Sequence, residues 1–173
     1  MNEGDAYSTA YALAQAIKKI GQFDLIIAGR QASDTDRGQV GVAVAEMLGI
    51  PSITIGKSIE IKDSKVIVER VRTDGSEVVE APLPALVTVS NELGEPRYPT
   101  LRGIMAAGRK KPTVWTAADI GADAAKSGAK GRVVNLTRLY IPKVEKVCEF
   151  IDGENAADKG KKLALKLRQA KLI

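Results

Sequence analysis

Apolar positions near the start of the chain recur with the period of an α-helix. Residues 5–20 place tyrosine, alanine, leucine and isoleucine on one helical face, and Gly21 follows directly. The next apolar run, 24–29, is short and ends in glycine, which predicts a buried, parallel strand. A second helical pattern over 38–48 is closed by Gly49.

The middle of the chain changes to a period of two. Segments 58–62, 65–72 and 77–81 alternate apolar with polar residues. They are separated by Asp63-Ser64 and Asp74-Gly75, which favour tight turns. The pattern predicts an antiparallel hairpin region at the edge of the sheet.

The last third has a weaker pattern. Two prolines precede a further buried strand, 85–89, and the chain after Trp115 is rich in alanine, glycine and aspartate, with a short extended piece at 133–136. A terminal helix is predicted from about 154 to 171. Its leucines are few, so it is marginal alone and is expected to dock on another surface.

The order helix, strand, loop, helix, strand is typical of an open α/β sheet with crossover helices. We expect a three-layer α/β/α fold with an open, mainly parallel sheet, an antiparallel hairpin region and a C-terminal arm and helix. The first strands of such a sheet are missing, so the chain is expected to begin inside the fold. We predict a partial α/β domain at 1–130 and a C-terminal arm and helix at 131–173.

Composition narrows the chemistry. The 173 residues include no histidine and one cysteine, Cys148, which argues against imidazole triads, histidine metal sites and a disulfide framework, and fits a reducing compartment. No apolar run reaches the ~18 residues of a membrane span. The net charge of +5 suits an anionic ligand or partner, whereas 4% aromatics offer few stacking platforms for nucleic acid.

The polar loop between the first strand and the second helix is a candidate anion site, because open α/β sheets bind ligands at that position. Free N–H groups at the helix start, and close approach at Gly38 and Gly41, suit a phosphate. Asp34 or Asp36 could bind ribose hydroxyls. Alternatively, Asp34, Thr35 and Asp36 only cap the helix, and the spacing matches neither a P-loop nor the dinucleotide fingerprint.

The start of the first helix offers a second candidate. Ser8 or Thr9 could donate a hydrogen bond to a phosphate, whereas Asp5 as a simple N-cap is the alternative.

A short helix after two prolines is a candidate contact surface. Thr100 can cap it, and an apolar stripe is followed at once by basic residues, which suits docking onto a hydrophobic groove rimmed by acids. The alternative is that the stripe belongs to the core and the basic residues form a solvated face. The stripe comprises Leu101, Ile104 and Met105, and the basic residues are Arg109, Lys110 and Lys111.

Together these segments resemble the beta subunit of electron transfer flavoprotein, over nearly the whole chain. Residues 24–41 are similar to that family's strand and nucleotide loop, and 68–88 to its signature region. Residues 95–111 resemble its partner-recognition loop, and 140–142 with the terminal helix are also similar.

The resemblance implies an adenine nucleotide hydrolase-like fold and a heterodimeric electron carrier, found in the cytoplasm or, in eukaryotes, the mitochondrial matrix. Such a carrier passes electrons between flavin dehydrogenases, such as the acyl-CoA dehydrogenases of fatty acid oxidation, and a quinone reductase or other acceptor. The partner alpha subunit holds the redox-active FAD, and the beta subunit buries AMP. The carrier has no catalytic residues of its own, no bound metal, no nucleic-acid partner and no membrane insertion.

The resemblance also assigns residues. Leu101 would enter a client dehydrogenase, supported by Ile104, Met105 and the basic residues after them. The residues that would line the nucleotide site are Asp34, Asp36, Gly38, Gln39, Val40 and Gly41, with Asp5 and Thr9 as further members.

Three departures leave alternatives open. The family's amino-terminal third, part of its nucleotide pocket, is missing from this chain. Val40 after Gln39 resembles bifurcating relatives that hold a second FAD in place of AMP, although Thr35 to Gly38 do not match their loop. Ala106-Ala107-Gly108 replaces lysines of the recognition loop. A nucleotide-binding regulatory module without a redox role is the remaining alternative.

Overall fold

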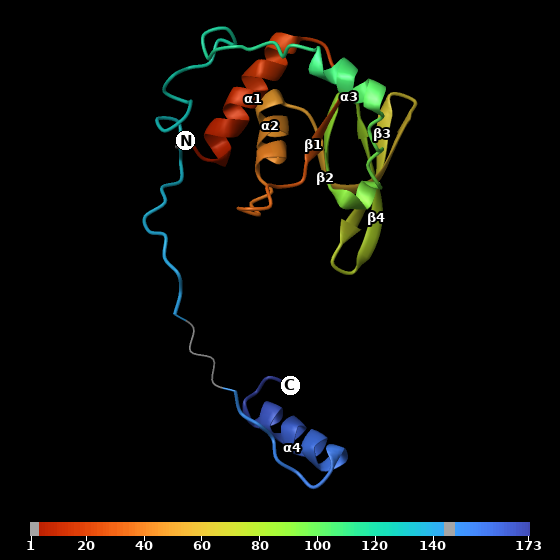
Figure 1. The fold of residues 1–173 in the computed structure, drawn as a ribbon, viewed down its shortest axis with the longest axis vertical. Helices are drawn as coiled ribbons and strands as arrows, with labels where there is room; N and C mark the ends of the chain where they lie inside the picture. Colours follow the sequence, from red (N-terminus) through yellow and green to blue (C-terminus); the bar gives the residue numbers. More distant parts are fainter. Residues whose placement is uncertain (1–3, 144–147) are drawn as a thin grey trace. The chain divides into compact units, whose positions relative to one another are not determined.

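The computed structural model describes residues 4–143 and 148–173; residues 1–3 and 144–147, which fall within the two predicted domains, lie outside the described residues. The chain divides into two compact units, Met1–Asn135 and Leu136–Ile173. The first unit contains the sheet and its helices, and the second contains the terminal helix (Figure 1).

One five-stranded sheet organises the first unit, in the order β1-β5-β2-β3-β4. Strand β5 (Ala85–Val89) pairs in parallel with β1 (Leu25–Gly29) on one side and with β2 (Ser52–Lys62) on the other. Strands β3 (Lys65–Arg72) and β4 (Gly75–Pro82) continue from β2 in antiparallel pairs. The predicted hairpin region is therefore confirmed.

Helices α1 (Ala6–Ile20) and α2 (Val40–Leu48) pack together and against one face of the sheet. Side chains of alternate strand residues form a second cluster on the opposite face. The first cluster is built on Ala10, Val44, Ala45 and Leu86; the second is built on Ile53, Val66, Val68, Ala81, Ala85 and Val87. This mixed sheet with flanking helices agrees with the predicted three-layer α/β/α class.

Beyond β5 the chain forms a 3-10 turn, η1 (Asn91–Leu93), and a short helix, α3 (Leu101–Gly108). It then returns along one face of α1, where Tyr11, Gln15 and Lys19, spaced four residues apart, hold it through hydrogen bonds. The Tyr11 hydroxyl accepts from the amide of residue 123 at 3.0 Å, and Lys19 Nζ donates to the carbonyl of residue 119 at 2.7 Å. Residues 133–136, expected to be extended, form no strand.

The second unit contains helix α4 (Ala156–Gln169), which Asn155 caps by accepting the Asp158 amide at 2.9 Å. None of the helix residues is buried, and Phe150 before it is 84% exposed. An open hollow of about 460 Å³ between residues 149–152 and α4 is lined by Phe150 and Leu165. Within 4–143 and 148–173, no helix is both long and apolar enough to cross a membrane.

Candidate functional site

The candidate ligand-binding edge is formed where parallel strands β1 and β5 end level with each other. Gly29 pairs with Val89, and the amide of Arg30 donates to the Val89 carbonyl at 2.8 Å. The loop after β1 and the segment after β5 therefore leave the sheet next to each other. Ligands of open α/β sheets bind at this position.

The loop after β1 has a fixed shape. The Asp36 amide donates to the Ala32 carbonyl at 2.9 Å, and Gln31 Nε2 donates to Asp36 Oδ1 at 2.9 Å. The backbone turns through positive φ at Asp36 (48°) and Gly38 (61°), a conformation that aspartate tolerates and glycine favours. Gln31 was not among the predicted site residues, although its amide bridges the loop.

Among the residues that the structure describes, no side chain caps the start of α2. Its N-cap residue, Gln39, has helical backbone angles and makes no side-chain hydrogen bond to the helix. The alternative that Asp34, Thr35 or Asp36 caps this helix is therefore wrong. Within 4–143 and 148–173, the first N–H groups of α2 have no side-chain acceptor, which is the arrangement that favours an anion at a helix N-terminus.

Gly41, in the first turn of α2, is buried against the sheet. A Cβ added there would lie 2.8 Å from Thr88 Cγ2, so only glycine allows the helix to approach β5 this closely. The remaining predicted loop residues lie around the helix start: Asp34, Asp36 and Gln39 are exposed, and Gly38 and Val40 are half-buried.

Charge at the edge comes from both neighbouring segments. Arg30 follows β1, and Glu92 follows β5 in η1. The hydroxyl of Ser90 donates to the Glu92 carboxylate and lowers its pKa, and the positive charge of Arg30 acts in the same direction. Glu92 therefore remains ionised beside the loop at neutral pH.

Asp5 is the N-cap of α1. Its Oδ1 accepts the Ser8 amide at 2.9 Å, and its Oδ2 accepts the amides of Val133 and Val134 at 2.8 and 3.0 Å. Desolvation favours the neutral carboxyl, but these hydrogen bonds outweigh it and lower the pKa of Asp5 to about 2. Thr9 donates its hydroxyl to the Asp5 carbonyl at 2.8 Å. The N-cap interpretation of Asp5 is confirmed.

The predicted contact segment lies on the surface. Thr100 caps α3 by accepting the Gly103 amide at 3.1 Å, as expected. Leu101 is 75% exposed, and Ile104 and Met105 are each 54% exposed, so the alternative that they are core residues is wrong. Arg109 to Lys111 follow the helix and are exposed.

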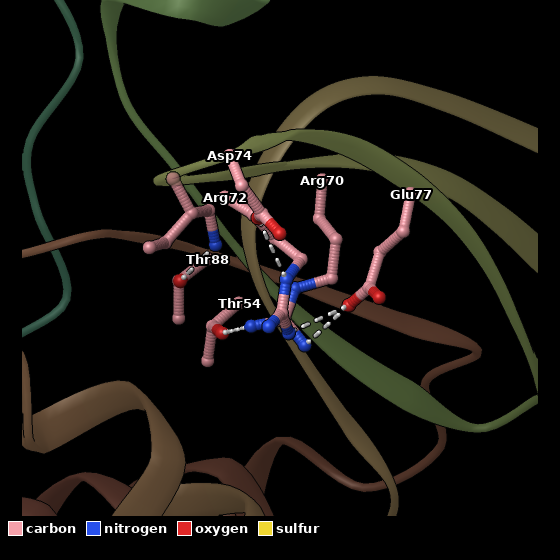
Figure 2. Close-up of polar contacts among 7 residues, drawn as sticks. Thr54, Arg70, Arg72, Asp74, Glu77 and Thr88 are labelled. Carbon is pink, nitrogen blue, oxygen red and sulfur yellow. Dashed lines mark hydrogen bonds and ion pairs between the residues drawn. The ribbon is translucent and has the colours of Figure 1, made fainter.

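A charged cluster on β3 and β4 was not predicted as a unit. Arg70 Nη2 donates to Thr54 Oγ1 at 2.8 Å, and its Nη1 lies 3.3 Å from Glu77 (Figure 2). Arg72 also contacts Glu77, at 3.6 Å. Arg70 pairs with Gly56, which pairs with Val89, so the cluster lies in the same sheet row as the end of β5.

The match to a known family decides the identity of the domain. Residues 1–120 match the model of the electron transfer flavoprotein domain. The chain belongs to that family. The electron transfer flavoprotein domain thus includes the candidate loop and α3, whereas α4 lies beyond the matched residues. The resemblance inferred from the sequence is confirmed.

Individual relatives carry beta-subunit names. The chain is 41% identical over 150 residues to the electron transfer flavoprotein subunit beta of Thermoanaerobacterium thermosaccharolyticum, covering 86% of this chain and 57% of that protein. It is 42% identical over 144 residues to the same subunit of Megasphaera elsdenii, covering 80% and 53%.

A third relative belongs to a named complex. The caffeyl-CoA reductase-Etf complex subunit CarD of Acetobacterium woodii is 37% identical over 169 residues, which cover 98% of this chain and 64% of that protein. The chain therefore spans between about half and two thirds of the length of these electron transfer flavoprotein relatives.

Proposed function

We propose that this chain acts as the beta subunit of a heterodimeric electron transfer flavoprotein. It passes electrons between flavin dehydrogenases, such as acyl-CoA dehydrogenases, and a quinone reductase or other acceptor, within the cytoplasm or the mitochondrial matrix. The alpha subunit holds the redox-active FAD, which supplies the one-electron chemistry. Family membership of residues 1–120 and beta-subunit relatives support this role.

The uncapped start of α2 is the proposed nucleotide-binding site. Its N–H groups and helix dipole bind the phosphate of AMP, below a loop already shaped by the Gln31–Asp36 hydrogen bond. Asp34 contacts the ribose hydroxyls. Since Asp5 and Thr9 are engaged in the cap of α1, the proposed set is confined to residues 34–41.

A second FAD in place of AMP is the second candidate ligand. Val40 supports it, because Val-Gly after Gln39 resembles the loop of bifurcating relatives. The relative from Acetobacterium woodii is a subunit of a caffeyl-CoA reductase-Etf complex, which also favours this alternative. Both ligands place phosphate at the same helix start, so the two candidates share their binding chemistry.

Helix α3 is the proposed docking site for a client dehydrogenase. Leu101 provides the most exposed large apolar side chain of the helix, and Ile104 and Met105 extend the stripe. Arg109, Lys110 and Lys111 complement an acidic rim on the client. A small interface of this kind suits a transient contact that must release after each electron transfer.

The substitution Leu101→Ala tests this docking site. In the heterodimer we expect flavin reduction by a client dehydrogenase to slow about tenfold, because a central apolar anchor is lost from a small interface. Val114→Ala, at an 81% exposed valine outside α3, is the matched control. Stopped-flow absorbance of the flavin gives the rate, and equal rates in both variants would contradict the assignment.

The second unit is the proposed contact with the alpha subunit. Phe150 and Ile141 are 84% and 93% exposed, and α4 buries no residue of its own. Exposed apolar side chains in this number are typical of a surface that another protein covers. The same contact would supply the packing that α4 lacks.

A further inference from the structure

Strand β2 contains a bulge where it runs beside β5. From Ile53 to Gly56 the chain advances three residues, while β5 advances two, from Val87 to Val89. The bulge includes Ile55, whose φ of +60° is unusual for a β-branched residue. Such a conformation persists only where surrounding contacts hold it.

Thr88 holds the bulge. Its Oγ1 accepts the Ile55 amide at 3.1 Å, so a side-chain hydroxyl replaces the backbone acceptor that a regular ladder would supply. Figure 2 shows Thr88 beside the cluster of Thr54, Arg70 and Glu77. Because Thr54 is the residue before Ile55, the bulge also presents Thr54 to the guanidinium of Arg70.

The other branch of Thr88 faces α2. The Cγ2 methyl lies 2.8 Å from the position where Gly41 would carry a Cβ, and Thr88 is only 2% exposed. The first turn of α2 therefore rests directly on this methyl group. One buried side chain thus contacts both the uncapped helix start and the bulge in β2.

We propose that Thr88 is a positioning residue that couples the start of α2 to the bulge in β2. A phosphate bound at α2 stabilises the contact between Gly41 and the Thr88 methyl group. This contact holds the Thr88 hydroxyl in the position where it accepts the Ile55 amide. The ordered bulge in turn holds Thr54 of β2 in place, and Thr54 accepts a hydrogen bond from Arg70 on β3. The proposal rests on the nucleotide site proposed above, because the anion acts on α2.

Substitutions at Thr88 separate the two contacts. Thr88→Val keeps a methyl toward α2 and loses the acceptor for Ile55, whereas Thr88→Ser keeps the acceptor and loses Cγ2. In the heterodimer without added nucleotide, we expect amide hydrogen exchange at Ile55 to be about tenfold faster in Thr88→Val, and near wild type in Thr88→Ser. Equal exchange in Thr88→Val and wild type would overturn the role of the hydroxyl.

The helix contact is tested without any ligand. Gly41→Ala places a methyl group on Cγ2 of Thr88, so we expect exchange at Ile55 to accelerate although residue 41 lies on another element. The double variant Gly41→Ala with Thr88→Ser removes the opposing methyl and should restore slow exchange. Acceleration that persists in the double variant, or none in Gly41→Ala, would overturn the coupling. This arm holds even where Thr88→Val does not fold.

Added AMP tests the coupling to the ligand. We expect AMP to slow exchange at Ile55 in wild type and to leave it unchanged in Thr88→Val, with binding measured in parallel by calorimetry. AMP binding that leaves wild-type exchange unchanged would overturn the coupling and retain the nucleotide site. If the wild type bound no AMP, the proposed nucleotide site would fail, and the coupling would be decided by the ligand-free variants.

Discussion

The two units of the chain differ in how far their apolar side chains are buried. In the first, Leu86 is completely buried beneath the helices, and Val66, Val68 and Val87 are completely buried on the opposite face of the sheet. In the second, helix α4 has a leucine-bearing stripe as well, yet buries none of its residues. A similar amphipathic pattern therefore serves an internal core in one unit and an outward-facing surface in the other.

Leu86→Ala should give the largest effect. Leu86 joins the cluster beneath α1 and α2, so its truncation leaves a cavity and is expected to lower the free energy of unfolding by about 3 kcal/mol. Leu165→Ala, at a 52% exposed leucine of α4, is the control and should change it little. Urea unfolding of the chain measures both, and equal losses would contradict the contrast between the units.

Phe150→Ala should act on assembly instead of folding. Phe150 lines the hollow against α4, and we expect its loss to weaken the affinity for the alpha subunit about tenfold while unfolding of the first unit is unchanged. Val78→Ala, at a 71% exposed valine on β4, is the matched control. Titration of one subunit into the other measures the affinity. Unaltered affinity in Phe150→Ala would remove the second unit from the interface.

Asp5→Asn should have a moderate, pH-dependent effect. Asparagine still caps α1, but its amide nitrogen cannot accept from Val133 and Val134, so a loss of about 1 kcal/mol is expected at neutral pH. The folded pKa of about 2 lies below the ordinary aspartate value of 3.8.

The sign of this pH dependence follows from the lowered pKa. The stabilising contribution of Asp5 is complete above the unfolded pKa and is lost as the pH falls through the folded one. Urea unfolding between neutral pH and about pH 3 should therefore show a steeper decline in wild type than in Asp5→Asn. Parallel curves would show that Asp5 does not contribute to acid unfolding.

Lys65→Ala should have the smallest effect. Its Nζ lies 2.7 Å from Glu80 across the β3–β4 pair, but both side chains are at least half exposed. Water screens such a pair, and we expect a change below about 0.5 kcal/mol. A double-mutant cycle with Glu80→Ala measures the pair alone. A coupling as large as the loss in Leu86→Ala would overturn the view that the core dominates this unit.

Local patterns predicted the elements well. The turn at Asp63-Ser64 has positive φ at both residues, and Gly49 ends α2 in the left-handed conformation. Both features are predicted by the residue types at those positions. Helices α1 and α2 and strands β3 and β4 follow from periodicity, and β1 and β5 follow from their short apolar runs, whereas the predicted segment 58–62 covers only the second part of β2. The hydrophobic pattern alone left the exposure of Leu101 open, because the same apolar stripe fits a core or a surface.

Features that depend on distant residues were missed. Nothing near Ile55 indicates a bulge, since its amide is satisfied by Thr88, 33 residues later. The acidic run Asp34 to Asp36 has the composition of a helix cap, but the chain turns away and Gln39 begins the helix without one. The contact of Gly41 with Thr88 likewise joins two elements, so the sequence indicates a glycine but not its neighbour.

The nucleotide site at α2 is tested by denaturing the purified complex of this chain with its alpha subunit and quantifying every nucleotide released. We expect one FAD from the alpha subunit and one AMP from the site at α2 in each heterodimer. Two FAD without AMP would assign that site to a second flavin and favour bifurcation. A single FAD with no further adenine nucleotide, from a well-folded complex, would contradict the nucleotide site.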